Sequence, residues 1–202
     1  LWSEPQLKMS GKGAYDSKAD KLVVEGTSFV VDGLSATAKG QLEQCSTKQR
    51  VDLSGEFTYD WDLLAKRFSE SFRKNVQLTG KDRRPFALRG TLASASLSST
   101  VSETNASDLS GQAGIGWASA IAYGMNFGTA DISLRIDKGV GRLNPIDMAV
   151  NEGKLHLAPQ FRFDVTPSLL VLPKEKVLDH VRLSPELCNQ WLKFVAPLLA
   201  DA

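Results

Sequence analysis

The chain has 202 residues, with 24 basic and 23 acidic side chains and a formal net charge of +1. A balance this close to neutral gives no general attraction to nucleic acid, and the length allows one or two domains with an ordinary core. No run of about 18 apolar residues occurs, so we expect no membrane span in the sequence. Because it starts at Leu1 rather than Met, we expect it to be a piece of a longer protein.

The dominant pattern is a regular alternation of apolar and polar residues over whole segments. A period of two puts every second side chain on the same face of a strand, so each segment has one apolar and one polar face. Strands of this kind form antiparallel sheets with one face in water. The clearest examples are residues 34–42, 51–59, 131–137 and 155–165.

Residues 1–93 are predicted to form an N-terminal β block. Strands joined by tight turns run from residue 6 to 59, and Asp32-Gly33 indicates a two-residue hairpin turn because both residues tolerate positive φ. A short helix is expected near 60–72, with acidic residues at its start and basic residues near its end. Strand periodicity returns at 76–80 and 86–92, completing this block.

The second half begins after a segment rich in Ser, Thr, Asn and Gly at 94–112, which is predicted to be a long loop. Residues 113–202 form a C-terminal β block, in which strands are expected over the four segments 115–127, 129–137, 140–150 and 154–165. The two blocks are expected to form one continuous fold.

The end of the chain changes period, which predicts an amphipathic helix at 184–199. Ser184 is suited to the cap position and Pro185 to the first helical position. We expect this helix to pack on the apolar face of the sheet. The fold class is therefore mainly β, a curved antiparallel amphipathic sheet shaped as a half-barrel or groove, with one or two short helices.

Searches for catalytic motifs find no phosphate loop, dinucleotide fingerprint or nucleophile elbow. His156 and His180 have no neighbouring residues at metal-ligand spacing, and we expect both to be solvated. Asp60 and Asp62 resemble a pair of acids, but a helix start attracts carboxylates without catalysis. The sequence therefore predicts no enzyme, cofactor or metal site.

A positive charge concentration lies between Lys66 and Arg89, where eight basic residues meet only two acidic ones. Beside an apolar groove such a zone could contact anionic lipid head groups; a merely solvated face is the other interpretation. The candidate contacts are Arg73, Lys74, Lys81, Arg83 and Arg84.

The only two cysteines are Cys45 and Cys188. They could form one disulfide if the compartment is oxidising, or they could be two separate thiols.

The strand–turn–strand cadence of residues 128–139 and 151–159, and of 21–26 with 38–42, resembles the C-terminal repeats of AsmA-like envelope proteins. The resemblance covers about half the chain. It implies a non-enzymatic segment of a large protein that is anchored in the inner membrane and projects into the periplasm. Its implied partners are lipid and the remainder of its own chain, with an apolar β-groove that binds or conducts acyl chains.

A second interpretation is an extracellular or periplasmic β-sandwich that serves adhesion or carbohydrate binding. Such a module needs exposed aromatic side chains on a polar strand face. Trp61, Trp117 and Trp191 fall on apolar faces instead, and only Trp2 is an exception.

Overall fold

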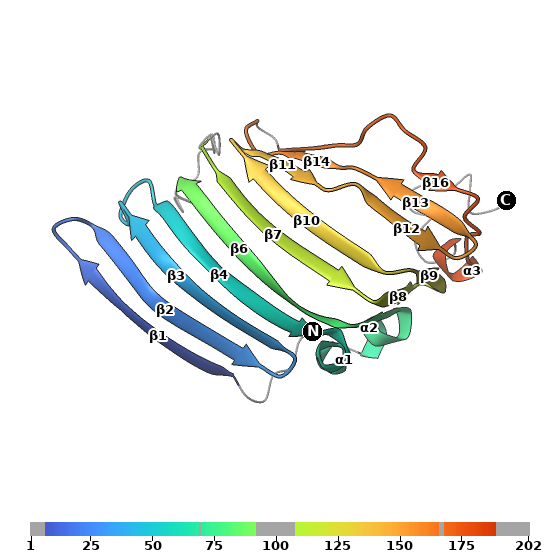
Figure 1. The fold of residues 1–202 in the computed structure, drawn as a ribbon, viewed down its shortest axis with the longest axis horizontal. Helices are drawn as coiled ribbons and strands as arrows, with labels where there is room; N and C mark the ends of the chain where they lie inside the picture. Colours follow the sequence, from blue (N-terminus) through green and yellow to red (C-terminus); the bar gives the residue numbers. More distant parts are fainter. Residues whose placement is uncertain (1–6, 69, 92–107, 166–167, 189–202) are drawn as a thin grey trace.

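The structure is a computed structural model, and it describes residues 7–68, 70–91, 108–165 and 168–188. Two open antiparallel sheets lie side by side, so that the strands form an elongated curved surface (Figure 1). This confirms the predicted fold class: the protein is mainly β, with short helices.

The large sheet has ten strands. Their order across the sheet is β1 (Lys8–Asp16), β2 (Lys21–Val31), β3 (Leu34–Glu43), β4 (Arg50–Asp60), β6 (Lys81–Thr91), β7 (Ser110–Trp117), β10 (Ala130–Asp137), β11 (Val140–Leu143), β14 (Gln160–Arg162) and β15 (Leu169–Val171).

The small sheet has six strands and continues beside β10 (Figure 1). Their order is β16 (Leu178–Asp179), β13 (Gly153–Leu157), β12 (Ile146–Val150), β9 (Met125–Phe127), β8 (Ser119–Ala122) and β5 (Val76–Thr79). Both sheets draw strands from both predicted blocks, so the described strands of the two blocks pair with one another.

The strand register sorts the large sheet into one apolar and one polar face. Directly opposed residues point to the same side, as Leu34 does with Tyr59 and Phe57 with Ala36. The members of the apolar face include Leu22, Val24, Phe29, Val31, Leu34, Leu42, Val51, Leu53, Phe57, Tyr59, Phe86, Leu88, Ile115, Trp117, Ile132, Leu134, Ile136, Leu143, Phe161 and Leu170.

The main core lies where the two sheets meet. Ile146, Met148 and Val150 of β12 are buried there. Trp117 and Ile132, from the apolar face of the large sheet, pack against this cluster. The apolar face therefore continues from one sheet onto the next.

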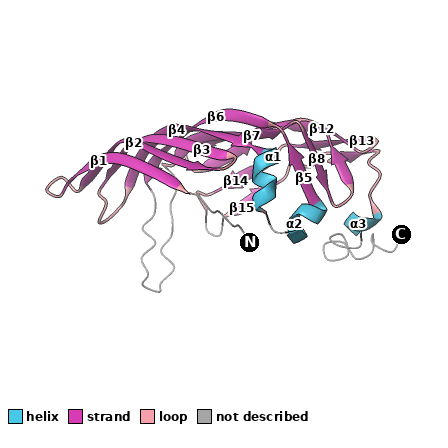
Figure 2. Cartoon of the chain, turned by 90° about the horizontal axis from the view of Figure 1, so that it is seen from below, coloured by secondary structure: helices cyan, strands magenta, loops and turns pink. Residues whose placement is uncertain are grey.

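Three short helical segments follow β4: α1 (Trp61–Leu64), the 3-10 helix η1 (Ala65–Arg67) and α2 (Glu70–Asn75). The Asp60 side chain caps α1 by accepting from two backbone amides. Leu64 is buried at this end of the sheet together with Val31 and Tyr59. These helices and α3 (Pro185–Leu187) lie on one side of the strands (Figure 2).

The helices differ from the predicted ones in extent. The single helix expected near 60–72 is interrupted, because Phe68 after η1 has an extended backbone. The helix expected at 184–199 starts at Pro185 as predicted, and its part after residue 188 lies outside the described residues. The Ser184 hydroxyl donates to Tyr123 O of the turn before β9.

Several predicted strands are divided or misplaced. Segment 140–150 breaks before Pro145 and segment 154–165 before Pro159, since proline has no amide hydrogen for a ladder. Segment 115–127 divides into three strands. The predicted loop at 94–112 ends too late, because β7 starts at Ser110 and pairs with β6; residues 92–107 lie outside the described part.

Candidate functional site: an apolar trough

The apolar face of the large sheet, which we call the trough, runs across the strands. Its central side chains are only half-buried, including those of Leu53, Phe86 and Leu134. Ile115 is 37% exposed. Side chains of this type inside a closed core are normally buried almost completely. The trough is therefore an apolar surface that stays partly accessible, with most of the charged residues on the opposite face of the same strands.

The middle of the trough has an aromatic floor. The rings of Phe57 and Phe86 lie 6.3 Å apart, and those of Phe57 and Tyr59 lie 5.8 Å apart. Phe86 covers Gly55, where a Cβ atom would lie 2.8 Å from the end of the ring. Glycine is needed at this position because any side chain would collide with Phe86 and with the neighbouring strand.

One end of the trough is held by the side chains of Tyr59 and Trp61. The Tyr59 hydroxyl accepts from Gly116 N–H at 2.7 Å and donates to Gly116 O at 3.1 Å. The Trp61 indole donates to the same carbonyl at 2.7 Å. Because β6 pairs with β7 only near residues 110–112, these side chains supply the hydrogen bonds that a neighbouring strand would otherwise give to Gly116.

The positive charge of Arg84 lies at this end of the apolar face, and two acidic side chains neutralise it. Arg84 lies 2.6 Å from an oxygen of Asp82 and 2.8 Å from one of Asp131. The Nε atom of Arg84 is close to Asp82 but is not aligned for a hydrogen bond, so this contact is an ion pair only. Arg84 therefore contributes to the structure of the trough end.

The five predicted head-group contacts do not form one cluster. Arg73 and Lys74 are exposed on α2, where Lys74 pairs with Glu70 at 3.0 Å. Lys81 and Arg83 lie on the polar face of β6, where Arg83 pairs with Glu56 of β4. Arg84 lies on the opposite face. These residues are close in the sequence, but they lie on a helix and on both faces of a strand, so their side chains are separated.

The two cysteines are free thiols in the structure. Cys45 follows β3, where its sulfur donates to Leu42 O at 3.4 Å, and Cys188 follows α3. These elements lie at opposite ends of the molecule (Figure 1), whereas a disulfide needs Cα atoms within about 7 Å. The disulfide considered from the sequence is therefore absent within one chain.

His156 has partners that the sequence spacing did not indicate. Its Nδ1 contacts Asp147, which lies directly opposite on β12, and its Nε2 lies 3.2 Å from Glu175. The hydrogen bond with Asp147 is the main cause that raises the pKa of His156. A prediction that residues 146–157 form a β-hairpin with Ile146 opposite Leu157 would have placed His156 opposite Asp147. Among the described residues no cluster of His, Cys, Asp and Glu could hold a metal ion.

Comparison with known proteins adds no relative: no family model, curated protein or solved structure matches the chain. In the parts of the chain that the structure describes, no helix is both long and apolar enough to cross a membrane. Function must therefore be inferred from the trough and from the polar face.

Proposed function

We propose that the apolar trough binds lipid acyl chains and that the protein is a non-enzymatic lipid-binding segment. One observation carries the proposal: a continuous apolar face extends over two sheets while its central side chains stay half-exposed. Large accessible apolar surfaces on soluble domains mark binding sites. The apolar surface extends across all the strands of the large sheet, which leaves room for a chain-like ligand.

The dimensions agree with an acyl chain. Neighbouring strands lie about 4.8 Å apart, so the ten strands of the large sheet span about 43 Å. One leaflet of a bilayer has an apolar depth of about 15 Å, half of the bilayer core. The trough is thus long enough for an acyl chain lying along it, and each buried CH2 group contributes about 0.8 kcal/mol before the costs of binding.

The cellular setting that we propose follows from the resemblance to AsmA-like proteins. In that setting the segment belongs to a longer protein anchored in the inner membrane, and it faces the periplasm. The trough would then hold or conduct lipid together with the remainder of the same chain.

Carbohydrate binding has less support. Sugar sites on β-modules present aromatic rings on an accessible polar surface. On the polar face of the described strands in the large sheet there is no aromatic side chain. The aromatic rings of these strands are on the trough side.

Photo-crosslinking tests the proposal without altering the core. Benzoylphenylalanine at position 115 replaces Ile115, which faces the trough; at position 58 it replaces Thr58, which is exposed on the polar face of β4. After delipidation and reloading with phosphatidylglycerol, native mass spectrometry should show a lipid adduct only for the variant at position 115. Equal labelling at both positions, or a stable protein that takes up no lipid, would overturn the proposal.

A further inference from the structure

On the polar face of the large sheet, several basic side chains pair with an acidic side chain on the neighbouring strand. Arg89 and Asp52, directly opposed on β6 and β4, lie 2.9 Å apart, and Lys21 and Glu43 on β2 and β3 lie 3.1 Å apart. Such opposite-charge pairs stabilise the register of the strands by small amounts.

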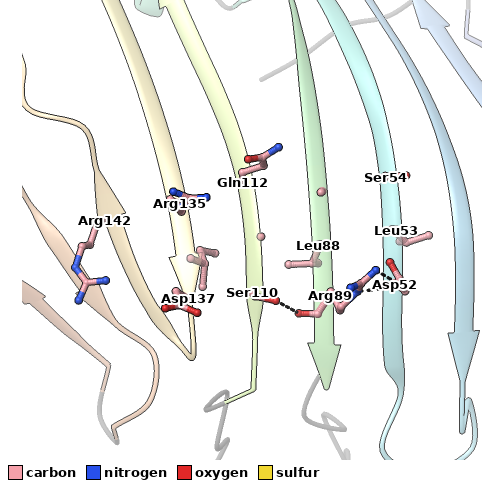
Figure 3. Close-up of a pocket in the computed structure, with 13 residues that line it drawn as sticks. Asp52, Leu53, Ser54, Leu88, Arg89, Ser110, Gln112, Arg135, Asp137 and Arg142 are labelled. Carbon is pink, nitrogen blue, oxygen red and sulfur yellow. Dashed lines mark hydrogen bonds and ion pairs between the residues drawn. The ribbon is translucent and has the colours of Figure 1, made fainter.

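Arg135 and Arg142 are arranged differently. They are directly opposed on β10 and β11, and both are exposed. Figure 3 shows the Asp52–Arg89 ion pair on one side, while no interaction reaches Arg135 or Arg142. Neither arginine forms an ion pair with an acidic side chain in the described ranges. Like charges in direct cross-strand register are destabilising, so this arrangement calls for an anion between them.

The turn that precedes β11 enforces this juxtaposition. Lys138 and Gly139 have φ values of 48° and 75°, which is typical of a two-residue hairpin turn. With Asp137 opposite Val140 across that turn, Arg135 must face Arg142. The pair therefore follows from the fold of the hairpin.

The arginines line a hollow of about 810 Å³ on the polar face. Gln112 lies opposite Arg135 on β7, and Ser110 of the same strand also lines the hollow. Asp137 is the remaining charge, because Arg89 and Asp52 neutralise each other. The hollow thus holds a net positive charge beside neutral hydrogen-bonding groups, and its volume is that of a small-molecule site.

We propose that this hollow binds a phosphate group, either free or as the head group of a lipid. Each guanidinium presents a planar fork of N–H donors, and a phosphate has enough oxygens to accept from both forks. Facing arginines have Cβ atoms about 5 Å apart, so their forks can reach one phosphate. A single carboxylate has only two oxygens and satisfies one fork. The site lies on the face opposite the trough and does not depend on acyl-chain binding.

The test titrates inorganic phosphate into protein whose arginine Nε–H groups are observed by NMR. The variants are Arg135→Gln and Arg142→Gln, and the matched control is Lys39→Gln. Lys39 is also exposed and on the polar face, four strands away on β3. We expect each arginine variant to lose at least about tenfold in phosphate affinity and the lysine variant to change less than about twofold.

Sedimentation with phosphatidylcholine vesicles, with and without phosphatidic acid, separates the two sources of phosphate. Binding to phosphatidic acid vesicles that depends on Arg135 and Arg142 assigns a lipid head group, whereas binding of inorganic phosphate alone assigns a soluble ligand.

A stability measurement distinguishes this role from a structural one. Without phosphate, Arg142→Gln should melt at the same temperature as the wild type or higher, because repulsion is relieved. Adding phosphate should raise the melting temperature of the wild type only. Equal loss of phosphate binding in the Lys39 variant, destabilisation by Arg142→Gln without phosphate, or absence of binding at 10 mM phosphate would each overturn the proposal.

Discussion

Replacing Tyr59 by phenylalanine removes one hydroxyl group from the closed end of the trough. The ring is 2% exposed, and Gly116, whose amide and carbonyl it contacts, is buried. In the variant the carbonyl keeps the Trp61 indole as donor, but the amide loses its acceptor. A buried donor without an acceptor costs about 1–3 kcal/mol, so we expect the free energy of unfolding to fall by that amount.

Urea unfolding followed by far-UV circular dichroism measures the loss. Tyr15→Phe is the matched control, because Tyr15 is 55% exposed and its hydroxyl donates to Asp20 at 2.9 Å where water can substitute. We expect less than about 0.5 kcal/mol for the control, with unchanged m-values in both variants. A loss for Tyr59→Phe no greater than for Tyr15→Phe would show that Gly116 finds another partner.

Three further predictions concern other parts of the fold. Met148→Ala, in the core between the sheets, should lower the free energy of unfolding by about 2–5 kcal/mol in chemical denaturation, while Leu170→Ala, at a position 59% exposed, should change it little. Asp60→Ala removes the cap of α1 and should cost about 1 kcal/mol in the same assay; no loss would contradict the capping contacts. The contact with Asp147 raises the pKa of His156 in the folded protein. The stabilisation that this contact gives is therefore complete below the pKa of His156 in the unfolded chain, and it disappears as the pH rises through the pKa of His156 in the folded protein. Thermal melts should therefore show a greater loss for His156→Gln at pH 5.5 than at pH 8.5, and equal losses would exclude this linkage.

The alternation in the sequence predicted most of the strands and which of their side chains share a face. It could not predict how the strands divide between the sheets, because periodicity reports which side chains share a face and not which strands pair. Signals for the divisions were present: Pro145 and Pro159 stand at two of them. Tyr123 and Gly124, both with positive φ, form the turn between β8 and β9.

The sequence predicted the apolar nature of the candidate site but only some of the residue positions in it. One-sided strands predict an apolar face, but its continuity depends on Trp117 packing against the buried cluster that includes Met148, which no local pattern reveals. The predicted head-group contacts do not all share one face, because neighbours such as Arg83 and Arg84 lie on opposite faces of one strand. Conversely, the facing of Arg135 and Arg142 could have been found by counting back from the turn at Lys138-Gly139.

Register links the two faces functionally. A slip of one residue between strands would move charged side chains into the trough and apolar ones into water, so the trough exists only while the register holds. On the polar face, ion pairs such as Asp52–Arg89 favour the correct register. At Arg135 of β10 no such ion pair is present, and Asn144 contributes backbone contacts instead: its side chain accepts from Ser133 N–H at 2.6 Å and donates to Asp131 O at 3.0 Å. With backbone contacts fixing this strand, Arg135 is free of a register-setting role and can serve a ligand.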